Sequence, residues 1–340
     1  MFGNLVTKPF VSMKRGVKIL VTVALMLTIG YLFFRFSPWP SALFFRYVFD
    51  REGEKMNQAL AKHVPEGITE ILDQAYDEGV AMDIFYPSNV SEDSVLPALV
   101  WVHGGGWISG SKDQVGNYCR ILASHGFVVA SIDYSIAPEA TYPTPVRQTM
   151  KALGFLQSRA RDYRLDTARV VLAGDSGGAH IVAQAAAVIT DTAYARLMNI
   201  RPALTGNQLK AMLLFCGAYD ATRVNLDGSF GGFLRTVLWS YSGSRDFQHD
   251  PEFRTASVVQ YVSKDFPRSF IAAGNADPLL PQSRAMAARL TQLGVAVDSL
   301  FFAPDYSPPL PHEFQFNLDT EAGQETLRRA IAFLKRAPQP

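Results

Sequence analysis

The nine residues VVLAGDSGG at positions 170–178 join an apolar run to a glycine-rich turn with one serine. The apolar run predicts a buried strand, and a helical pattern follows the turn. A G-x-S-x-G sequence between a strand and a helix is typical of a nucleophile elbow, in which the serine hydroxyl projects from the top of a sheet. Glycines two residues before and after Ser176 relieve crowding in such a turn. The alternative is a glycine-rich helix start that Ser176 caps.

Apolar runs alternate with helical patterns on both sides of this turn, which predicts an α/β fold with a mostly parallel, doubly wound sheet. The predicted strands lie near 96–102, 127–132, 170–173, 212–215, 270–273 and 299–302, after two shorter candidates at 68–72 and 81–86. The predicted helices lie near 115–125, 146–161, 179–189, 282–293 and 324–334, with a weaker pattern at 54–62. Ligands of such sheets bind at the carboxyl ends of the strands.

One aromatic-rich insertion, residues 221–266, interrupts the alternation of strands and helices. A structureless loop of this length is uncommon in a compact domain. We therefore expect the insertion to form helices of a lid over the strand ends.

The composition excludes several classes of protein. The 340 residues include 32 basic and 31 acidic side chains, a net charge of +1, which argues against a broad basic surface for nucleic acid. Two cysteines are too few for a disulfide scaffold or a Cys₄ zinc site, and no His or Cys spacing indicates a metal. We expect no cofactor, and the oligomeric state is open.

The N-terminal region contains an uncharged apolar run at residues 19–34. At about 1.5 Å per residue this run spans roughly 24 Å, close to a hydrocarbon core once flanking Lys18 and Arg35 extend outward. Basic residues precede the run, and Asp50 is the first acidic residue. The positive-inside rule then predicts an uncleaved anchor with a cytoplasmic N-terminus and the rest of the chain periplasmic or lumenal. A cleaved signal peptide, giving a secreted protein, and a soluble core helix are the alternatives.

A second glycine-rich segment, HGGGW at residues 103–107, directly follows the predicted strand 96–102. Glycines allow backbone N–H groups to approach a substrate closely, as in the oxyanion element of lipases and esterases. We expect Gly104, Gly105 and Gly106 to contribute to an oxyanion hole together with the N–H of Gly177. A phosphate-binding loop is disfavoured because no G-K-[S/T] follows. His103 is expected to orient the loop.

A nucleophilic serine needs a base, and in this kind of fold the base comes last in the chain. His312 follows the last apolar run and is the predicted base. His249 lies inside the proposed lid, and His180 lies on the same helix as Ser176, pointing away from the elbow.

The orienting acid should follow the preceding strand. Asp277 comes directly after 270–273 and is the predicted acid. Asp220, one strand earlier, and Asp305, on the loop of His312, are its rivals.

The chain resembles the hormone-sensitive-lipase-like (bacterial type IV) family of α/β-hydrolases over roughly residues 65–336. The resemblance rests on HGGGW at 103–107, DYSIAPE at 133–139, GDSGG at 174–178, DPL at 277–279 and His312. It implies a triad of Ser176, Asp277 and His312, an oxyanion hole at the glycines above and an N-terminal cap. Ser135 departs from the family pattern, where Arg is usual, and Gly177 stands where Ala is common.

These features together predict a membrane-tethered serine carboxylesterase acting on small-molecule esters of short to medium acyl chains. The expected organisation is a cytoplasmic tail at 1–18, a transmembrane anchor at 19–36, a linker with cap helices at 37–66 and a catalytic domain at 67–340. The same triad acting on an amide, formamide or lactone is one alternative, and a non-catalytic binding protein at the membrane is another.

Overall fold

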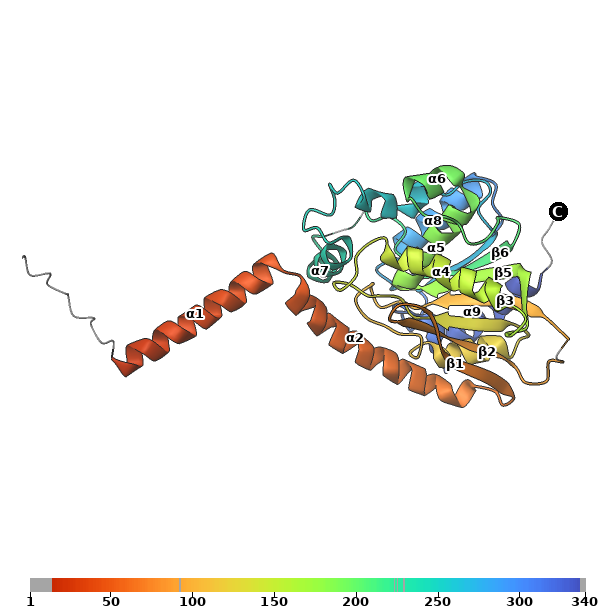
Figure 1. Ribbon diagram of the computed structural model, residues 1–340, viewed down its shortest axis with the longest axis horizontal. Helices are drawn as coiled ribbons and strands as arrows, with labels where there is room; N and C mark the ends of the chain where they lie inside the picture. Colours follow the sequence, from red (N-terminus) through yellow and green to blue (C-terminus); the bar gives the residue numbers. More distant parts are fainter. Residues whose placement is uncertain (1–13, 92, 223, 225, 229, 337–340) are drawn as a thin grey trace, which may run out of the picture.

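The computed structural model describes residues 14–91, 93–222, 224, 226–228 and 230–336 (Figure 1). The strands are β1 (Ile68–Asp77), β2 (Val80–Pro87), β3 (Leu96–Val102), β4 (Val128–Ile132), β5 (Leu165–Asp175), β6 (Leu209–Phe215), β7 (Ser269–Ala273) and β8 (Val297–Phe301). The α-helices are α1 (Arg15–Phe36), α2 (Trp39–Leu60), α3 (Gly116–Ala123), α4 (Thr144–Ser158), α5 (Ser176–Thr190), α6 (Thr192–Leu197), α7 (Gly231–Ser242), α8 (Leu280–Gln292) and α9 (Glu321–Lys335). Short 3₁₀ turns lie at Ala61–His63, Phe253–Ala256, Val258–Gln260 and Phe314–Phe316.

The strands form one sheet in the order β1-β2-β4-β3-β5-β6-β7-β8. Strand β2 pairs antiparallel with β1 and β4, and the ladder from β4 to β8 is parallel. The parallel strands are continuous apolar runs because both faces of the sheet are covered. Within β3, Val100 and Val102 belong to a core shared with α4, α5 and α8, whereas Leu99 and Trp101 face a second core with α3 and α9.

The register brings two glycine-rich turns together at one edge of the sheet. Val102, the last residue of β3, pairs with Gly174 in β5, and Asp175 pairs with Phe215 at the end of β6. The chain therefore leaves β3, β5 and β6 at the same carboxyl edge, which is where such sheets bind ligands.

The predicted mostly parallel sheet is confirmed, and strand β3 has the predicted bounds. Strand β5 begins at Leu165, earlier than predicted. Its first residues are largely polar, so they lie outside the apolar run from which the strand is predicted. Helix α6 was not predicted from the sequence. The insertion at 221–266 holds helix α7 and two 3₁₀ turns, apart from positions 223, 225 and 229, which lie outside the described residues.

The segment after the apolar helix differs most from the prediction. Helix α1 begins at Arg15, and after Ser37 and Pro38 the chain forms the single 22-residue helix α2, where the sequence predicts a linker with cap helices and shows a helical pattern only near 54–62. Figure 1 shows α1 projecting from the domain that contains the sheet, while α2 runs along the edge of that domain. Among the described residues, α1 is the one helix long and apolar enough to cross a membrane, and none of its residues is buried.

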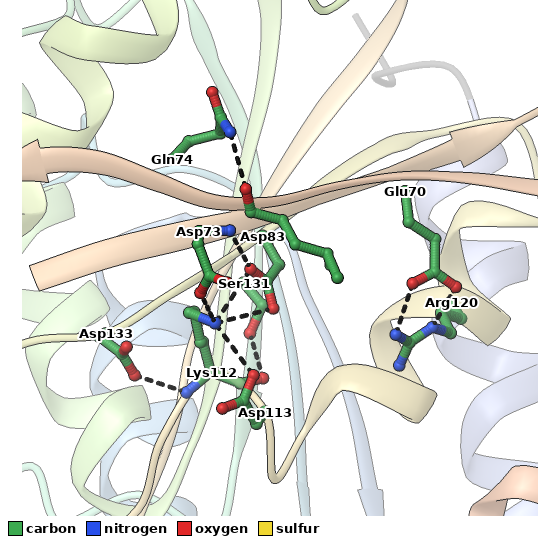
Figure 2. A network of polar contacts seen from close by, with 10 residues as sticks. Glu70, Asp73, Gln74, Asp83, Lys112, Asp113, Arg120, Ser131 and Asp133 are labelled. Carbon is green, nitrogen blue, oxygen red and sulfur yellow. Dashed lines mark hydrogen bonds and ion pairs between the residues drawn. The ribbon is translucent and has the colours of Figure 1, made fainter.

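A buried ion cluster anchors the loop that follows HGGGW (Figure 2). The Lys112 ammonium lies 3.0 Å from an Asp83 carboxylate oxygen, and both side chains are buried. It also contacts Asp73 at 2.8 Å and Asp113 at 3.0 Å, whose side chains are exposed. The backbone N–H of Lys112 donates to Asp133, at 2.7 Å. These contacts tie the loop to strand β2 and to the segment after β4.

Burial raises the pKa of Asp83, against the lowering effect of the Asp73 N–H and the Lys112 ammonium. We expect Lys112→Met to lower the free energy of unfolding by roughly 3–5 kcal/mol, because a buried carboxylate loses its cation. Urea unfolding of the full chain in detergent micelles, followed by near-ultraviolet circular dichroism, measures this change.

The matched control is Lys55→Met. Lys55 forms an exposed pair with Glu52 and should contribute less than about 1 kcal/mol. Equal unfolding midpoints for the two variants would contradict the structural role of Lys112.

Candidate active site

The turn between β5 and α5 has the geometry of a nucleophile elbow. Ser176 adopts a left-handed conformation with φ of +50°, which is strained for a residue with a side chain. The flanking glycines are required sterically. A Cβ on Gly178 would lie 2.0 Å from the Val102 carbonyl oxygen, and one on Gly174 would lie 2.7 Å from the same atom. The turn therefore packs backbone to backbone against the end of β3, and Ser176 stands at the edge of the sheet.

Ser176, His312 and Asp277 form a continuous hydrogen-bonded chain. The Ser176 hydroxyl lies 2.9 Å from His312 Nε2, and His312 Nδ1 lies 3.0 Å from Asp277 Oδ1. The Asp277 side chain is fully buried, whereas His312 is partly open to solvent. With the proton on Nδ1 donated to Asp277, Nε2 is free to accept the serine proton.

The loops of the acid and the histidine are fastened to each other. Asn275 Oδ1 accepts the N–H of Leu310 at 2.8 Å, and the Leu310 carbonyl accepts the N–H of Ala276 at 3.0 Å. Asn275 Nδ2 donates to the Tyr306 carbonyl at 3.0 Å. The long proline-rich loop before His312 is thereby fixed to the strand end that carries Asp277.

The rival residues lie in other surroundings. His249 is exposed and pairs with Asp246 at 2.6 Å. His180 is buried and contacts the Ala256 carbonyl at 2.8 Å, and burial lowers its pKa to about 4. Asp220 accepts hydrogen bonds from Thr222 at 2.6 and 3.0 Å.

Asp305, the remaining rival, is exposed on the loop that leads to His312. None of these four residues takes part in the hydrogen-bonded chain described above.

The HGGGW loop lies against the elbow. Gly105 and Gly106 have φ values of +93° and +60°, and a Cβ on Gly105 would lie 2.3 Å from the Ser109 carbonyl oxygen. A Cβ on Gly177 would lie 3.2 Å from the backbone nitrogen of Trp107, so the start of α5 touches this loop. The N-terminus of a helix and a glycine-rich turn both present N–H groups that suit a developing oxyanion.

His103 lies behind the loop. Its ring stacks on Tyr134 at 4.3 Å, and Nδ1 contacts the Gly104 carbonyl oxygen at 2.9 Å. Burial lowers the pKa of His103, against the raising effect of Asp133. A neutral, buried ring in this position supports the loop backbone.

A pair of carboxyl groups, Asp175 and Glu313, lies beside the hydrogen-bonded chain. Asp175 is buried, accepts a hydrogen bond from Trp101 Nε1 at 2.9 Å and bonds to Glu313. A Cβ on Gly104 would lie 2.2 Å from Asp175 Oδ2 and 2.8 Å from Glu313 Oε1, so this glycine leaves room for the pair. Burial, followed by the nearby Glu313 charge, raises the pKa of Asp175 well above its ordinary value. The raised pKa favours the neutral form of Asp175 beside the Glu313 carboxylate.

The Glu313 carboxylate also lies close to the histidine, since its Oε1 is 3.8 Å from His312 Nε2. Burial acts to lower the pKa of His312, but the adjacent Cys216 side chain, the hydrogen bond to Asp277 and, to a smaller extent, the Glu313 carboxylate outweigh it, and the pKa is raised well above its ordinary value. Cys216 lies next to His312 as a neutral thiol, because burial raises its pKa to about 11.

Cys216, Asp277 and His312 form a group whose potential metal-ligand atoms lie within 4.8 Å of one another, the one such group found in the part of the chain that the structure describes. His312 Nδ1 and Asp277 already bond to each other there. A metal would have to separate the two groups, so the donor set suits the hydrogen-bonded chain better than a resident ion.

Sequence reasoning did not identify Asp175, Glu313, Cys216 or Trp101 as parts of this site. A signal existed for the first two, since Asp175 is the variable position directly before the serine and Glu313 directly follows His312. Trp101 and Cys216 reach the site only because β3 and β6 end beside β5.

Comparisons with known proteins identify the family of this chain. The family model described as BD-FAE matches residues 82–290. Esterase LipQ of Mycobacterium tuberculosis is 28% identical over 230 residues, which cover 66% of this chain and 52% of that protein. The acetyl esterase of Salmonella paratyphi B is 31% identical over 197 residues, which cover 55% of this chain and 57% of that protein. The matched region thus spans little more than half the length of these relatives.

Solved structures are similar over most of the chain. An esterase from Pyrobaculum calidifontis superposes with a TM-score of 0.70 at 22% identity, covering 88% of this chain and 94% of its own. The carboxylesterase EstE1 from a metagenomic library superposes with a TM-score of 0.69 at 21% identity, covering 89% and 98%. At these identities the similarity establishes the α/β-hydrolase fold.

Proposed function

The chain belongs to the BD-FAE family of α/β-hydrolases, and from this premise we propose that it is a serine carboxylesterase. The observation that carries the proposal is the hydrogen-bonded chain from Ser176 through His312 to Asp277, at 2.9 and 3.0 Å. The esterases among its relatives support the same reaction class.

In the proposed mechanism the Ser176 hydroxyl attacks the carbonyl carbon of an ester while His312 Nε2 takes the proton. The N–H groups of Gly105, Gly106 and Gly177, with the Gly104 turn behind them, stabilise the oxyanion of the tetrahedral intermediate. His312 then returns the proton to the leaving alcohol, and Ser176 keeps the acyl group. Water, activated by His312, releases the acid and restores the serine. Asp277 holds His312 in the tautomer that this cycle needs.

The proposed substrates are esters with short to medium acyl chains, a range supported by the acetyl esterase among the relatives. We place the enzyme at a membrane, with α1 as an uncleaved anchor, its N-terminus in the cytoplasm and the catalytic domain outside. The exposed apolar surface of α1 and the basic residues before it support this placement.

The direct test of the mechanism is Ser176→Ala. We expect kcat to fall by roughly 10⁴–10⁶-fold, because the covalent route is lost. The full chain in detergent micelles is assayed on p-nitrophenyl esters from acetyl to dodecanoyl, and labelling by a fluorophosphonate is measured alongside. Labelling without ester turnover in the wild type would favour an amide, formamide or lactone. Undiminished turnover by the alanine variant would refute the assignment of Ser176.

The role of the acid is tested by Asp277→Asn. An amide at this position favours the wrong histidine tautomer, and we expect kcat to fall by about 10⁴-fold with the fold retained. Asp305→Asn is the matched control, since this rival acid is exposed on the same loop as His312. Its kcat should stay close to that of the wild type. The reverse pattern would transfer the acid role to Asp305.

The acid limb of the pH profile is tested by Glu313→Gln. His312 acts as a base only when neutral, so kcat/KM rises as the pH passes its pKa, which the Glu313 carboxylate raises. Removing that charge should move the rise to lower pH, by up to about one unit. Burial raises the pKa of Asp175, which opposes transfer of the negative charge to that carboxyl group.

The control for this substitution is Glu66→Gln, which changes an exposed carboxylate outside the site. Its profile should superimpose on that of the wild type. A rise that stays in place or moves to higher pH in Glu313→Gln would show that Glu313 does not act on His312.

A further inference from the structure

Helix α2 has an exposed apolar face at one end and an exposed polar face at the other. In its first three turns the exposed residues are Trp39, Leu43, Phe44, Tyr47 and Val48, with Phe44 63% and Tyr47 62% exposed. In its last turns the exposed residues are polar apart from Ala59, namely Arg51, Glu52, Glu54, Lys55 and Gln58. We call the first set the apolar face of α2. A contiguous exposed apolar patch of this kind marks an interaction surface.

The position of this face relative to α1 indicates what covers it. Only Ser37 and Pro38 separate the two helices, so α2 starts at the level where a membrane-spanning α1 would leave the hydrocarbon. Figure 1 shows α2 leaving α1 in a new direction, with the catalytic domain on one side and α1 on the other. Trp and Tyr are the side chains enriched at this depth of a bilayer.

Basic side chains surround the same end of the molecule. Arg51 donates to the Tyr47 hydroxyl at 3.1 Å, directly beyond the apolar face. A cavity of about 380 Å³ lies where α1 ends, and its lining includes Phe34 of α1 together with Arg235 and Arg245. Asp246 also lines the cavity and Asp227 lies 3.9 Å from Arg235, so the charge there is mixed. An apolar face bordered by arginines complements the boundary between acyl chains and phosphate groups.

The opposite side of α2 is bonded to the catalytic loops. Arg46 donates to the Ile108 carbonyl at 2.6 Å and the Ala137 carbonyl at 2.7 Å, and it pairs with Glu139 at 2.6 Å. Asp50 accepts the N–H of Gly110 at 3.0 Å. The helix therefore has a fixed orientation relative to the loop that carries Gly105 and Gly106.

Aromatic contacts continue from α2 to the proposed oxyanion hole. The rings of Phe45 and Phe49 lie 5.1 and 5.3 Å from that of Phe233 on α7. Phe233 and Val237 would lie 3.5 Å from a Cβ on Gly106. One layer of side chains thus separates α2 from the loop where the substrate carbonyl would bind.

We propose that the apolar face of α2 lies on the bilayer surface and that the enzyme takes lipophilic esters dissolved in that membrane. This inference rests on the proposed function and on the anchor role of α1. With α2 seated on lipid, α7 and the loop at Gly106 stand at the membrane-facing end of the domain. An ester leaving the bilayer there reaches Ser176 without crossing bulk water.

The contact of α2 with the bilayer is tested on the full chain reconstituted in phosphatidylcholine vesicles with a minor fraction of phosphatidylglycerol. Phe44→Cys and Gln58→Cys are each labelled with a nitrobenzoxadiazole fluorophore, while the native Cys119 and Cys216 are buried. Lipids carrying a nitroxide near the headgroup should quench the label at 44 several-fold more than the label at 58. Equal quenching at the two positions would refute the contact of α2 with the bilayer, and this measurement needs no enzymatic activity.

Substrate access is tested by the double variant Leu43→Glu with Phe44→Glu. In the same vesicles we expect kcat/KM for a bilayer-dissolved fluorogenic medium-chain ester, such as a dodecanoyl ester, to fall roughly tenfold, because the charges lift α2 from the lipid. The rate on a water-soluble acetyl ester should stay within about twofold. Gln58→Glu with Ala59→Glu, at the polar end of the helix, should change neither rate.

An equal loss on both esters would show damage to the catalytic fold and would overturn the access role. Unchanged rates on both would overturn it as well. A wild type that hydrolyses no ester would refute the proposed function. The quenching comparison would still show whether α2 contacts the bilayer.

Discussion

The carbonyl oxygen of Val102 lies where a side chain on Gly178 would begin, and the site depends on this close approach. The end of β3 and the turn after β5 can approach this closely only because the turn residues that follow Ser176 are glycines. The same contact places the HGGGW loop against the first turn of α5. Backbone packing in the core thus positions the proposed nucleophile and the proposed N–H donors before any substrate is present.

Environment separates the roles of the acidic groups around His312. Asp277 is fully buried and bonded to Nδ1, where it orients the ring. Asp175 and Glu313 bond to each other next to Gly104, and burial raises the pKa of Asp175, which favours its neutral form. Two full negative charges there would oppose the oxyanion of the proposed mechanism. Strand β3 supports the arrangement through Trp101, whose indole N–H bonds to Asp175.

The sequence was sufficient to predict the parallel sheet, because continuous apolar runs such as β3 need no knowledge of their neighbours. It also placed Ser176, Asp277 and His312 at strand ends, and the structure brings their side chains within hydrogen-bonding distance. The first half of α2 shows no clear helical pattern in the sequence, because Arg46 and Asp50 face the protein together with Phe45 and Phe49, while Phe44 and Tyr47 face outward. Apolar side chains therefore lie on both faces, and the amphipathicity by which a surface helix is recognised is lost. The pairing of Asp175 with Glu313 depends on how a long loop returns to the sheet, which local pattern does not encode.

The contacts of Arg46 and Asp50 have a consequence for the modular architecture of the chain. They make α2 a structural part of the hydrolase, with Ile108, Glu139 and Gly110 as its attachment points. We therefore infer that the joint between α1, the proposed anchor, and the folding unit lies at Ser37 and Pro38, not near residue 67. Proteolysis at that joint would remove α1, and recombination there would replace it, while the hydrolase stays whole in either case. A break after Leu60 would remove the helix whose Arg46 and Asp50 side chains hold the loop at Ile108 and Gly110 in place.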